Sequence, residues 1–272
     1  MLNYDLLENN IEDYAFQFAN AKPQTYLVID HFLEAEVAQT AFQFFPKMED
    51  MDKLKDFRQL KAQDPAISKF HPLFQELIFE HLQSQRLLNI IAKISGIPNL
   101  IADEKLYASG LAQGENGSFL NVHIDNSSHP VQPWYRRLNL LVYLNPCWNE
   151  DKGGNLELWS DNMSESATIL PTFNRMVLFA TNQYSWHGYS RVNTPDGDSR
   201  KSINIYYFTE ESPNGSDYYH VTSFRGRKKE LINKALYPVD NGLRALARQL
   251  RPKKDDHAIL FESDKDLKSN DP

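Results

Sequence analysis

Seven short runs between residues 105 and 208 most restrict the folds open to this chain. Each run is rich in apolar or β-branched residues, and turn-forming residues such as Gly114, Gly153 and Pro171 lie between them. Many short strands separated by turns favour a sandwich or barrel. The predicted strands cover residues 106–112, 119–124, 138–144, 156–159, 167–170, 176–180 and 201–208.

The first hundred residues follow a helical pattern instead. Apolar residues recur at helical spacing over residues 4–19, 34–45 and 72–94, with a short strand over 26–29 between the first two helices. Residues 48–66 are charged and weakly patterned, which predicts a solvated loop or a strand pair near the rim of the site. We therefore expect a mainly β fold whose larger sheet is covered by flanking helices.

Composition excludes several classes of function. The net charge of −7 argues against a surface that coats nucleic acid, which needs clustered Lys and Arg. No apolar run approaches the roughly 20 residues of a membrane span, and the N-terminus lacks the pattern of a secretory signal. The single cysteine, Cys147, fits a reducing compartment. We expect a cytoplasmic protein without nucleic-acid or membrane partners.

A His-x-Asp pair at the end of one predicted strand is the clearest candidate for a metal site. Residues i and i+2 of a strand point to the same face, so His123 and Asp125 project together. His187 supplies a second imidazole from a distant strand. Two imidazoles and one carboxylate form the triad that holds non-haem Fe(II) with open coordination positions. An isolated His-x-Asp is more often an ordinary hydrogen-bonded element, so the distal histidine is what favours a metal.

Arg200 is the candidate for an anion anchor. The strand that it opens alternates, which places Arg200, Ser202 and Asn204 on one face. A guanidinium inside a barrel needs an anionic partner, because an unpaired buried charge is costly, and Arg pairs with a carboxylate through two hydrogen bonds. A surface salt bridge on an edge strand is the alternative interpretation.

These motifs, in this order, resemble the 2-oxoglutarate- and Fe(II)-dependent dioxygenases of the prolyl 4-hydroxylase-like group. The matching elements are the His123-Ile-Asp125 pair, the strand 137–145, the Gly-Gly hairpin strand 153–159, the run 175–179 before His187, and Arg200-x-Ser202. The resemblance covers roughly residues 105–210, with a weaker match at 26–33.

The resemblance implies a double-stranded β-helix, a cupin-like jelly-roll, within a single oxygenase domain over residues 1–250. Residues 1–100 would be its helical support, 101–210 its jelly-roll core and 211–250 a C-terminal extension. Residues 251–272 would form a flexible tail. Three residues would bind iron: His123, Asp125 and His187. Four would hold 2-oxoglutarate, with the arginine on its C5 carboxylate: Arg200, Tyr143, Ser202 and Asn139. Because the loop before Arg200 is longer than in many relatives, Arg191 is a rival anchor.

The resemblance also implies a reaction. With Fe(II), 2-oxoglutarate and O2 as co-substrates and ascorbate as a stimulating reductant, the enzyme would hydroxylate an unactivated C–H bond and release succinate and CO2. The substrate would be an amino acid, a peptidyl residue such as proline, or a small molecule. Gln113 stands where some relatives carry a substrate-side tyrosine, and Trp134 and Arg136 follow the metal-ligand motif as further substrate contacts. A non-catalytic jelly-roll module that binds a metal or ligand, or a zinc hydrolase, would use the same three ligands, but neither needs the arginine anchor.

Overall fold

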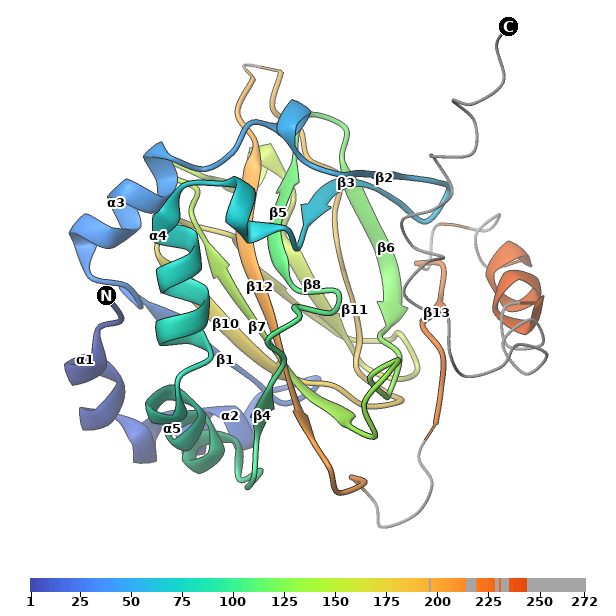
Figure 1. Ribbon diagram of the computed structural model, residues 1–272. Coiled ribbons are helices and arrows are strands. Elements are labelled where there is room, and N and C mark those ends of the chain that lie inside the picture. Colours follow the sequence, from blue (N-terminus) through green and yellow to red (C-terminus); the bar gives the residue numbers. More distant parts are fainter. Residues whose placement is uncertain (196, 214–218, 228–229, 231–234, 244–272) are drawn as a thin grey trace, which may run out of the picture.

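The computed structural model describes residues 1–195, 197–213, 219–227, 230 and 235–243, which form a curled β structure with helices along one side (Figure 1). The strands are β1 (Tyr26–Asp30), β2 (Lys53–Lys55), β3 (Gln59–Asp64), β4 (Ile101–Ala102), β5 (Gly110–Gly114), β6 (Phe119–Ile124), β7 (Tyr135–Tyr143), β8 (Leu156–Trp159), β9 (Ser166–Ile169), β10 (Arg175–Ala180), β11 (Trp186–Tyr189), β12 (Arg200–Thr209) and β13 (Ser223–Phe224). The helices are α1 (Tyr4–Asn9), α2 (Ile11–Asn20), α3 (Ala35–Gln43), α4 (Pro72–Gln75), α5 (Gln85–Ser95), the π-helix η3 (Glu76–Leu82), the 3-10 turns η1 (Met48–Asp50), η2 (Ile67–Lys69) and η4 (Glu150–Lys152), and a further helix over residues 235–243.

The strands form two facing layers. Their hydrogen-bonded order is β1-β10-β7-β12-β5-β3-β6-β11-β8-β9, and β2, β4 and β13 join β3, β12 and β6. The larger layer consists of β1, β10, β7, β12 and β5. The smaller layer consists of β6, β11, β8 and β9, and β3 connects the two layers. Apolar side chains of β7 and β10 pack against those of β8 and β9 across the space between. The prediction of a mainly β fold with a jelly-roll core is confirmed.

The helices of the first hundred residues cover the outer face of the larger layer, as predicted (Figure 1). Alternate residues of β7 leave the interior and are completely buried among helix side chains, as Leu138, Leu140 and Val142 show. Leu87 and Ile91 of α5 belong to the same apolar cluster. The period-two pattern of β7 therefore serves two environments, with a helix-covered core on one side and the interior of the curled sheet on the other.

Two of the three predicted helices are interrupted. The helix predicted over 4–19 divides at Asn10, whose side chain donates to the Leu6 carbonyl while its backbone N–H bonds Leu7. The helix predicted over 72–94 contains the π-helix and restarts at Ser84, whose hydroxyl accepts from the Leu87 N–H. Asn and Ser compete locally for backbone groups and favour helix ends over helix interiors.

The charged segment 48–66 is a strand pair and not a solvated loop. β2 and β3 form a hairpin, and β3 also pairs with β5 and β6. Because β3 has neighbours on both sides, Ala62 and Asp64 are fully buried. The predicted tail, 251–272, lies outside the described residues, and the predicted extension 211–250 is described only in part.

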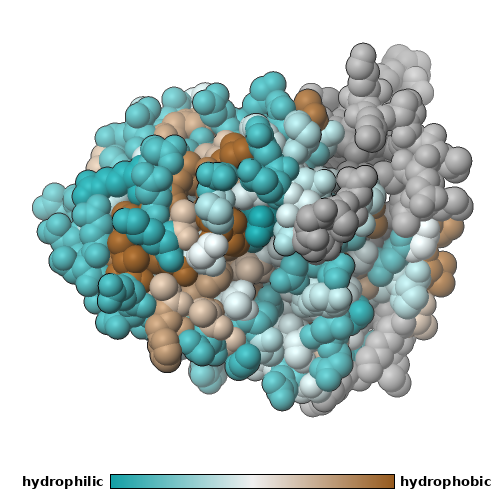
Figure 2. Space-filling view, turned by 90° about the horizontal axis from the view of Figure 1, so that it is seen from below, coloured by the Kyte–Doolittle hydropathy of each residue, from teal (hydrophilic) through white to brown (hydrophobic). Residues whose placement is uncertain are grey.

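None of the described helices combines the length and the apolar character that crossing a bilayer requires. Viewed from below, most of the surface is hydrophilic, and hydrophobic residues gather on the side where the helices lie (Figure 2). The exposed aromatic residue Phe16 belongs to α2, one of these helices.

Candidate active site

Three predicted metal ligands converge inside the curled sheet. His123 lies on β6, Asp125 directly follows that strand, and His187 lies opposite His123 on β11. Their possible ligand atoms all lie within 4.8 Å of one another. His123 Nε2 is 3.5 Å from Asp125 Oδ1, and His187 Nε2 is 3.6 Å from Asp125 Oδ2. Two imidazoles and one carboxylate therefore face a common point.

Backbone carbonyls orient both imidazoles toward that point. His123 Nδ1 bonds the Asn121 carbonyl at 3.0 Å, and His187 Nδ1 bonds the Ser185 carbonyl at 2.8 Å. A carbonyl only accepts, so Nδ1 carries the proton in each ring and Nε2 keeps its lone pair. Burial, and then the adjacent His123 ring, lower the pKa of His187 to about 4, which keeps that ring neutral at pH 7. The donor set and its orientation fit a divalent metal such as iron.

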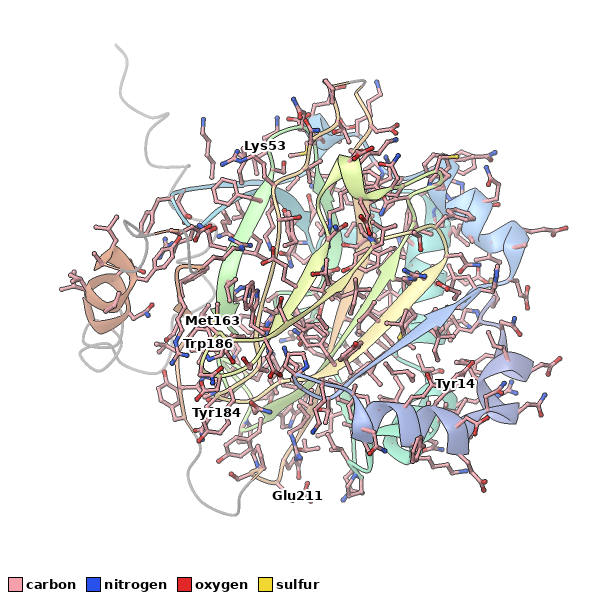
Figure 3. The ribbon with its side chains drawn as sticks, turned by 180° about the vertical axis from the view of Figure 1, so that it is seen from behind. Tyr14, Lys53, Met163, Tyr184, Trp186 and Glu211 are labelled. Atoms are coloured by element: carbon pink, nitrogen blue, oxygen red, sulfur yellow. The ribbon has the colours of Figure 1, made fainter. Side chains whose placement is uncertain are left out.

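A β-bulge in β6 brings more than one row of side chains inward. On β11, His187 and Tyr189 are two residues apart, whereas their partners His123 and Leu120 are three apart. The extra residue changes the alternation, so both partners can face the interior. Val122 and Ile124 turn the other way, where they pack with Met163 and Trp186 (Figure 3).

Asp125 is tied to two interior side chains. Arg136 Nη1 lies 3.2 Å from Asp125 Oδ2, and Asn139 Nδ2 donates to the same oxygen at 2.8 Å. Burial alone would raise the pKa of Asp125, but Arg136 and then the two histidines outweigh burial and hold the pKa well below its usual range. Asp125 is therefore a carboxylate at neutral pH, with its second oxygen fixed by donors. Asn139 faces the interior as predicted, and it contacts a metal-ligand candidate.

Arg136 lies in the interior rather than in the solvent-facing loop from which it was predicted to reach a substrate. Only 2% of the residue is exposed, and its guanidinium lies 4.1 Å from the ring centre of Tyr206. Its Nε and Nη2 atoms have no acceptor among the described residues. The Asp125 contact could not be foreseen, because β7 begins three residues before the predicted start at Leu138 and a register shift opposite Tyr207 and Phe208 turns Arg136 inward.

Arg200 opens β12 and points into the other end of the interior. It is 6% exposed. Its Nε donates to the Gly154 carbonyl at 2.7 Å and its Nη2 to the Tyr143 hydroxyl at 3.1 Å. Both partners are neutral, and no carboxylate among the described residues forms an ion pair with it. The structure thus brings together Arg200 and Tyr143, the two residues that were predicted to bind the same carboxylate.

Two further residues shape this end of the interior. A Cβ added at Gly154, where φ is +68°, would lie 2.9 Å from Arg200 Cδ, so glycine is what lets the hairpin approach the arginine. The Arg200 guanidinium also lies 4.2 Å from the ring centre of Tyr189, whose pKa burial raises to about 12. Tyr189 was not singled out from the sequence, although its position two residues after His187 gives it the same strand face.

Two further residues were connected with co-substrate binding, and the structure buries one of them, Ser202, and exposes the other, Arg191. Ser202 is buried on the same face of β12, opposite Tyr143, and its hydroxyl donates to Asn204 Oδ1 at 2.9 Å. The rival anchor, Arg191, is exposed and donates to the Gly117 carbonyl at 2.7 Å. The structure therefore places Arg200, and not Arg191, in the interior.

Two predicted substrate residues are not brought to the metal-ligand cluster. Gln113 lies opposite Lys201, so it shares the outward face of β12 and donates to Ser199 Oγ at 2.7 Å. Trp134 packs on His129, with ring centres 5.5 Å apart. The pairing of Gln113 with Lys201 therefore places Gln113 on the face of β5 away from the cluster.

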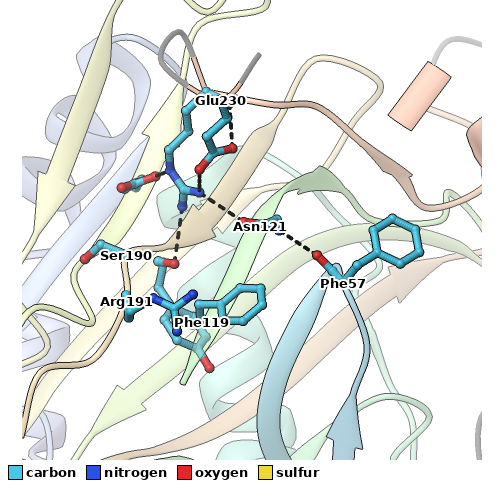
Figure 4. Close-up of a pocket in the computed structure, with 9 residues that line it drawn as sticks. Phe57, Phe119, Asn121, Ser190, Arg191 and Glu230 are labelled. Atoms are coloured by element: carbon cyan, nitrogen blue, oxygen red, sulfur yellow. Dashed lines mark hydrogen bonds and ion pairs between the residues drawn. The ribbon is translucent and has the colours of Figure 1, made fainter. Parts of the chain in front are cut away.

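A separate pocket of about 390 Å³ is lined by residues that include Phe57, Phe119, Arg191 and Glu230 (Figure 4). Arg227 crosses it and pairs with Glu157 at 2.7 Å and with Glu230 at 3.1 Å. None of the three metal-ligand candidates lines this pocket. Arg227 and the two glutamates of its lining are paired with one another, and this pocket is separate from the metal-ligand cluster.

Sequence comparisons bear on the residues that carry this site. The family described as the 2OG-Fe(II) oxygenase superfamily matches residues 109–208. Prolyl 3-hydroxylase OGFOD1 of Mus musculus is 25% identical over 199 residues, which are 68% of this chain and 33% of that protein. The Xenopus laevis protein of the same name is 25% identical over 199 residues, 70% of this chain and 35% of that protein. The chain thus spans about a third of the length of these relatives.

Solved structures support the fold. A prolyl hydroxylase from Trichoplax adhaerens, in complex with a peptide fragment of the hypoxia inducible factor oxygen degradation domain, has a TM-score of 0.53 and 19% identity, covering 77% of this chain and 94% of that one. A prolyl 4-hydroxylase from Phytophthora capsici has a TM-score of 0.52 and 18% identity, covering 90% of this chain and 76% of that one. The family match spans both histidines, the aspartate and Arg200, and it agrees with the resemblance in the motifs. Residues 109–208 of this chain are therefore similar in sequence to the 2OG-Fe(II) oxygenase superfamily.

Proposed function

We propose that this chain is an Fe(II)- and 2-oxoglutarate-dependent dioxygenase that hydroxylates an unactivated C–H bond. One juxtaposition carries the proposal. Two imidazoles and one carboxylate face a common point, and a buried arginine with neutral partners faces the same interior. A metal-binding module or a zinc hydrolase accounts for the three ligands but leaves Arg200 without a role.

Each interior side chain then has a task. His123, Asp125 and His187 would hold the ion through Nε2, a carboxylate oxygen and Nε2. Arg200 and Tyr143 would bind the C5 carboxylate of 2-oxoglutarate, because a charge-assisted pair stabilises a buried guanidinium. When bound, Fe(II) and 2-oxoglutarate supply the oxidative decarboxylation by O2 that gives succinate and CO2 and inserts one oxygen atom into a substrate C–H bond.

The protein also keeps the ligands fixed and the interior dry. The Asn139 and Arg136 donors prevent the Asp125 carboxylate from rotating. The Asn121 and Ser185 carbonyls hold the imidazole tautomers in place. Apolar side chains between the two layers exclude water from one side of the interior, and this strengthens the electrostatic interactions inside.

The class of substrate is inferred from the relatives in sequence and from one interior arginine. The relatives in sequence are described as prolyl 3-hydroxylases, which makes a peptidyl proline one candidate, beside a free amino acid or another small molecule. Arg136 is the best placed of the predicted substrate contacts, since two of its buried nitrogens lack an acceptor among the described residues. Residues 1–250 form one domain in this proposal. A cytoplasmic location rests only on the single, unpaired Cys147.

Two measurements test the proposed reaction. Anaerobic titration of the Fe(II)-loaded chain with 2-oxoglutarate should show saturable binding, and subsequent addition of O2 and ascorbate should release succinate. A metal-binding module would bind the ion without succinate formation, and a zinc hydrolase would not need 2-oxoglutarate. If the Fe(II)-loaded chain neither binds 2-oxoglutarate nor converts it, the oxygenase assignment is wrong.

A further inference from the structure

β3 carries a lysine into the interior beside the two strands that lead to the site. β2 pairs along one edge of β3, and β5 and β6 follow one another along its other edge. Ala62 lies opposite Gln113, and Gln113 lies opposite Lys201 on the outward face of β12. Since neighbouring residues of a strand point to opposite faces, Lys61 faces inward, on the side that Arg200 shares.

The backbone of Lys61 is in register with Arg200, and its side chain extends from there toward the metal-ligand cluster. Its Nζ donates to Gln63 Oε1 at 2.7 Å. Across β5, Gln63 lies at the level of Ser202, one inward position after Arg200. β12 continues from there toward the residue opposite Asn139, the partner of Asp125. The ammonium thus lies between the anchor and the cluster.

The charge of Lys61 is poorly compensated. Its single hydrogen bond goes to a neutral amide, and among the described residues it forms no ion pair. Burial lowers the pKa of Lys61 to about 8, attraction by Asp125 opposes this shift, and repulsion by Arg200 adds to it. A partly buried ammonium in this position would be stabilised by a bound anion.

We propose that Lys61 is a second cationic contact for the dicarboxylate co-substrate, and that it binds the carboxylate at the metal end while Arg200 binds the other. The proposal rests on the oxygenase function proposed above. 2-Oxoglutarate carries one carboxylate at each end. Arg200 and Lys61 are inward cations that form no ion pair with a carboxylate of the described residues, whereas Arg136 is paired with Asp125. Since β3 runs along β5, the neighbour of the anchor strand, and along β6, the strand of His123, a diacid that bridges anchor and cluster comes within reach of a lysine on β3.

Equilibrium binding to the full chain loaded with Zn(II), which blocks turnover, separates the two cations. The probes are 2-oxoglutarate and its 5-amide, which keeps the metal-end carboxylate and removes the charge at the other end. Lys61→Met should weaken the binding of both probes at least tenfold and by the same factor. Arg200→Met should weaken the binding of 2-oxoglutarate only, so that this variant no longer prefers the acid to the amide.

The chain offers a matched control. Lys201→Met removes a lysine from a neighbouring strand, on the outward face, where its Nζ donates to Ser199 Oγ at 2.7 Å. It should bind both probes as the unaltered chain does. Lys61→Arg keeps the positive charge and should retain more affinity than Lys61→Met. Thermal unfolding of each variant shows whether it is folded.

Three outcomes would overturn the proposal. If folded Lys61→Met binds 2-oxoglutarate as tightly as the unaltered chain, Lys61 does not contact the co-substrate. If Lys61→Met weakens the acid and not the amide, Lys61 belongs to the C5 end with Arg200. If the unaltered Zn(II)-loaded chain binds neither probe, the oxygenase function itself fails, and the role of Lys61 fails with it.

Discussion

Arg136 and Arg200 are two buried arginines that face one interior, but Arg136 has a charged partner and Arg200 has neutral ones. Arg136 has a carboxylate within the protein, at 3.2 Å, whereas Arg200 donates to a carbonyl and a hydroxyl. The first charge is compensated when the chain folds, and the second has no carboxylate among the described residues. Burial of an arginine therefore does not by itself indicate a binding site, and a buried arginine with neutral partners is the better candidate for one.

Stability should separate the two arginines most strongly. Arg136→Met removes the cation beside buried Asp125, and we expect the free energy of unfolding of the metal-free chain to fall by about 3–5 kcal/mol, because an uncompensated buried charge is left. Arg200→Met removes a charge that has no anionic partner, so it should leave the unfolding free energy unchanged or raise it. Urea titration of both variants measures the difference, and equal losses would contradict it.

Metal binding should depend on Asp125, the carboxylate that Arg136 contacts, and not on Arg200. A divalent ion at 100 times its dissociation constant stabilises a folded protein by about 2.7 kcal/mol. We expect this gain for the unaltered chain and for Arg200→Met, and its loss for Asp125→Asn, which keeps the shape of the side chain and removes the charged ligand. Thermal unfolding with and without Zn(II) measures it. A full gain in Asp125→Asn would exclude Asp125 as a ligand.

Binding of the co-substrate should depend on the guanidinium of Arg200. Loss of a buried, charge-assisted pair costs about 2 kcal/mol, which is roughly 30-fold in affinity. Arg200→Gln should therefore weaken 2-oxoglutarate binding by at least this factor. Arg191→Gln, in the exposed loop, serves as the control and should have no effect. The reverse order, measured by anaerobic calorimetry, would make Arg191 the anchor.

A smaller effect concerns the pH dependence of stability. Burial lowers the pKa of Lys61 from 10.5 to about 8 in the folded chain. Between these pH values the unfolded chain binds more protons, so raising the pH favours the folded state. The unfolding free energy of the unaltered chain, relative to Lys61→Met, should therefore rise from pH 8 to pH 10.5 and stay constant below pH 8. A flat difference across that window would show that Lys61 is solvated.

The sequence predicted those parts of the site that depend on strand alternation alone. His123 and Asp125 on one face, Tyr143 and Asn139 inward from β7, and Arg200 at a strand start follow from a period of two. Those inward orientations agree with the structure. The roles of these residues in binding iron and 2-oxoglutarate remain predictions for the experiments above.

The rest depended on which strands become neighbours. Nothing in the charged run 48–66 shows that β3 enters the sheet and pairs with both β5 and β6, so Lys61 remained unnoticed. Arg136 was assigned to a loop because the start of β7 is polar, and its carboxylate partner Asp125 directly follows another strand, β6. Gln113 was placed by counting back from His123, and a shift of one residue is enough to turn a strand residue outward.

The bulge in β6 limits how this chain can change. Regular alternation would let β6 present either Leu120 or His123 to the interior, and the extra residue lets it present both. Removing one residue between them would rotate one row of side chains away from the interior and leave the other in place. We expect substitutions between these positions to be tolerated far more readily than single-residue deletions, because the strand's length there, more than its composition, keeps the metal end and the anchor end facing each other.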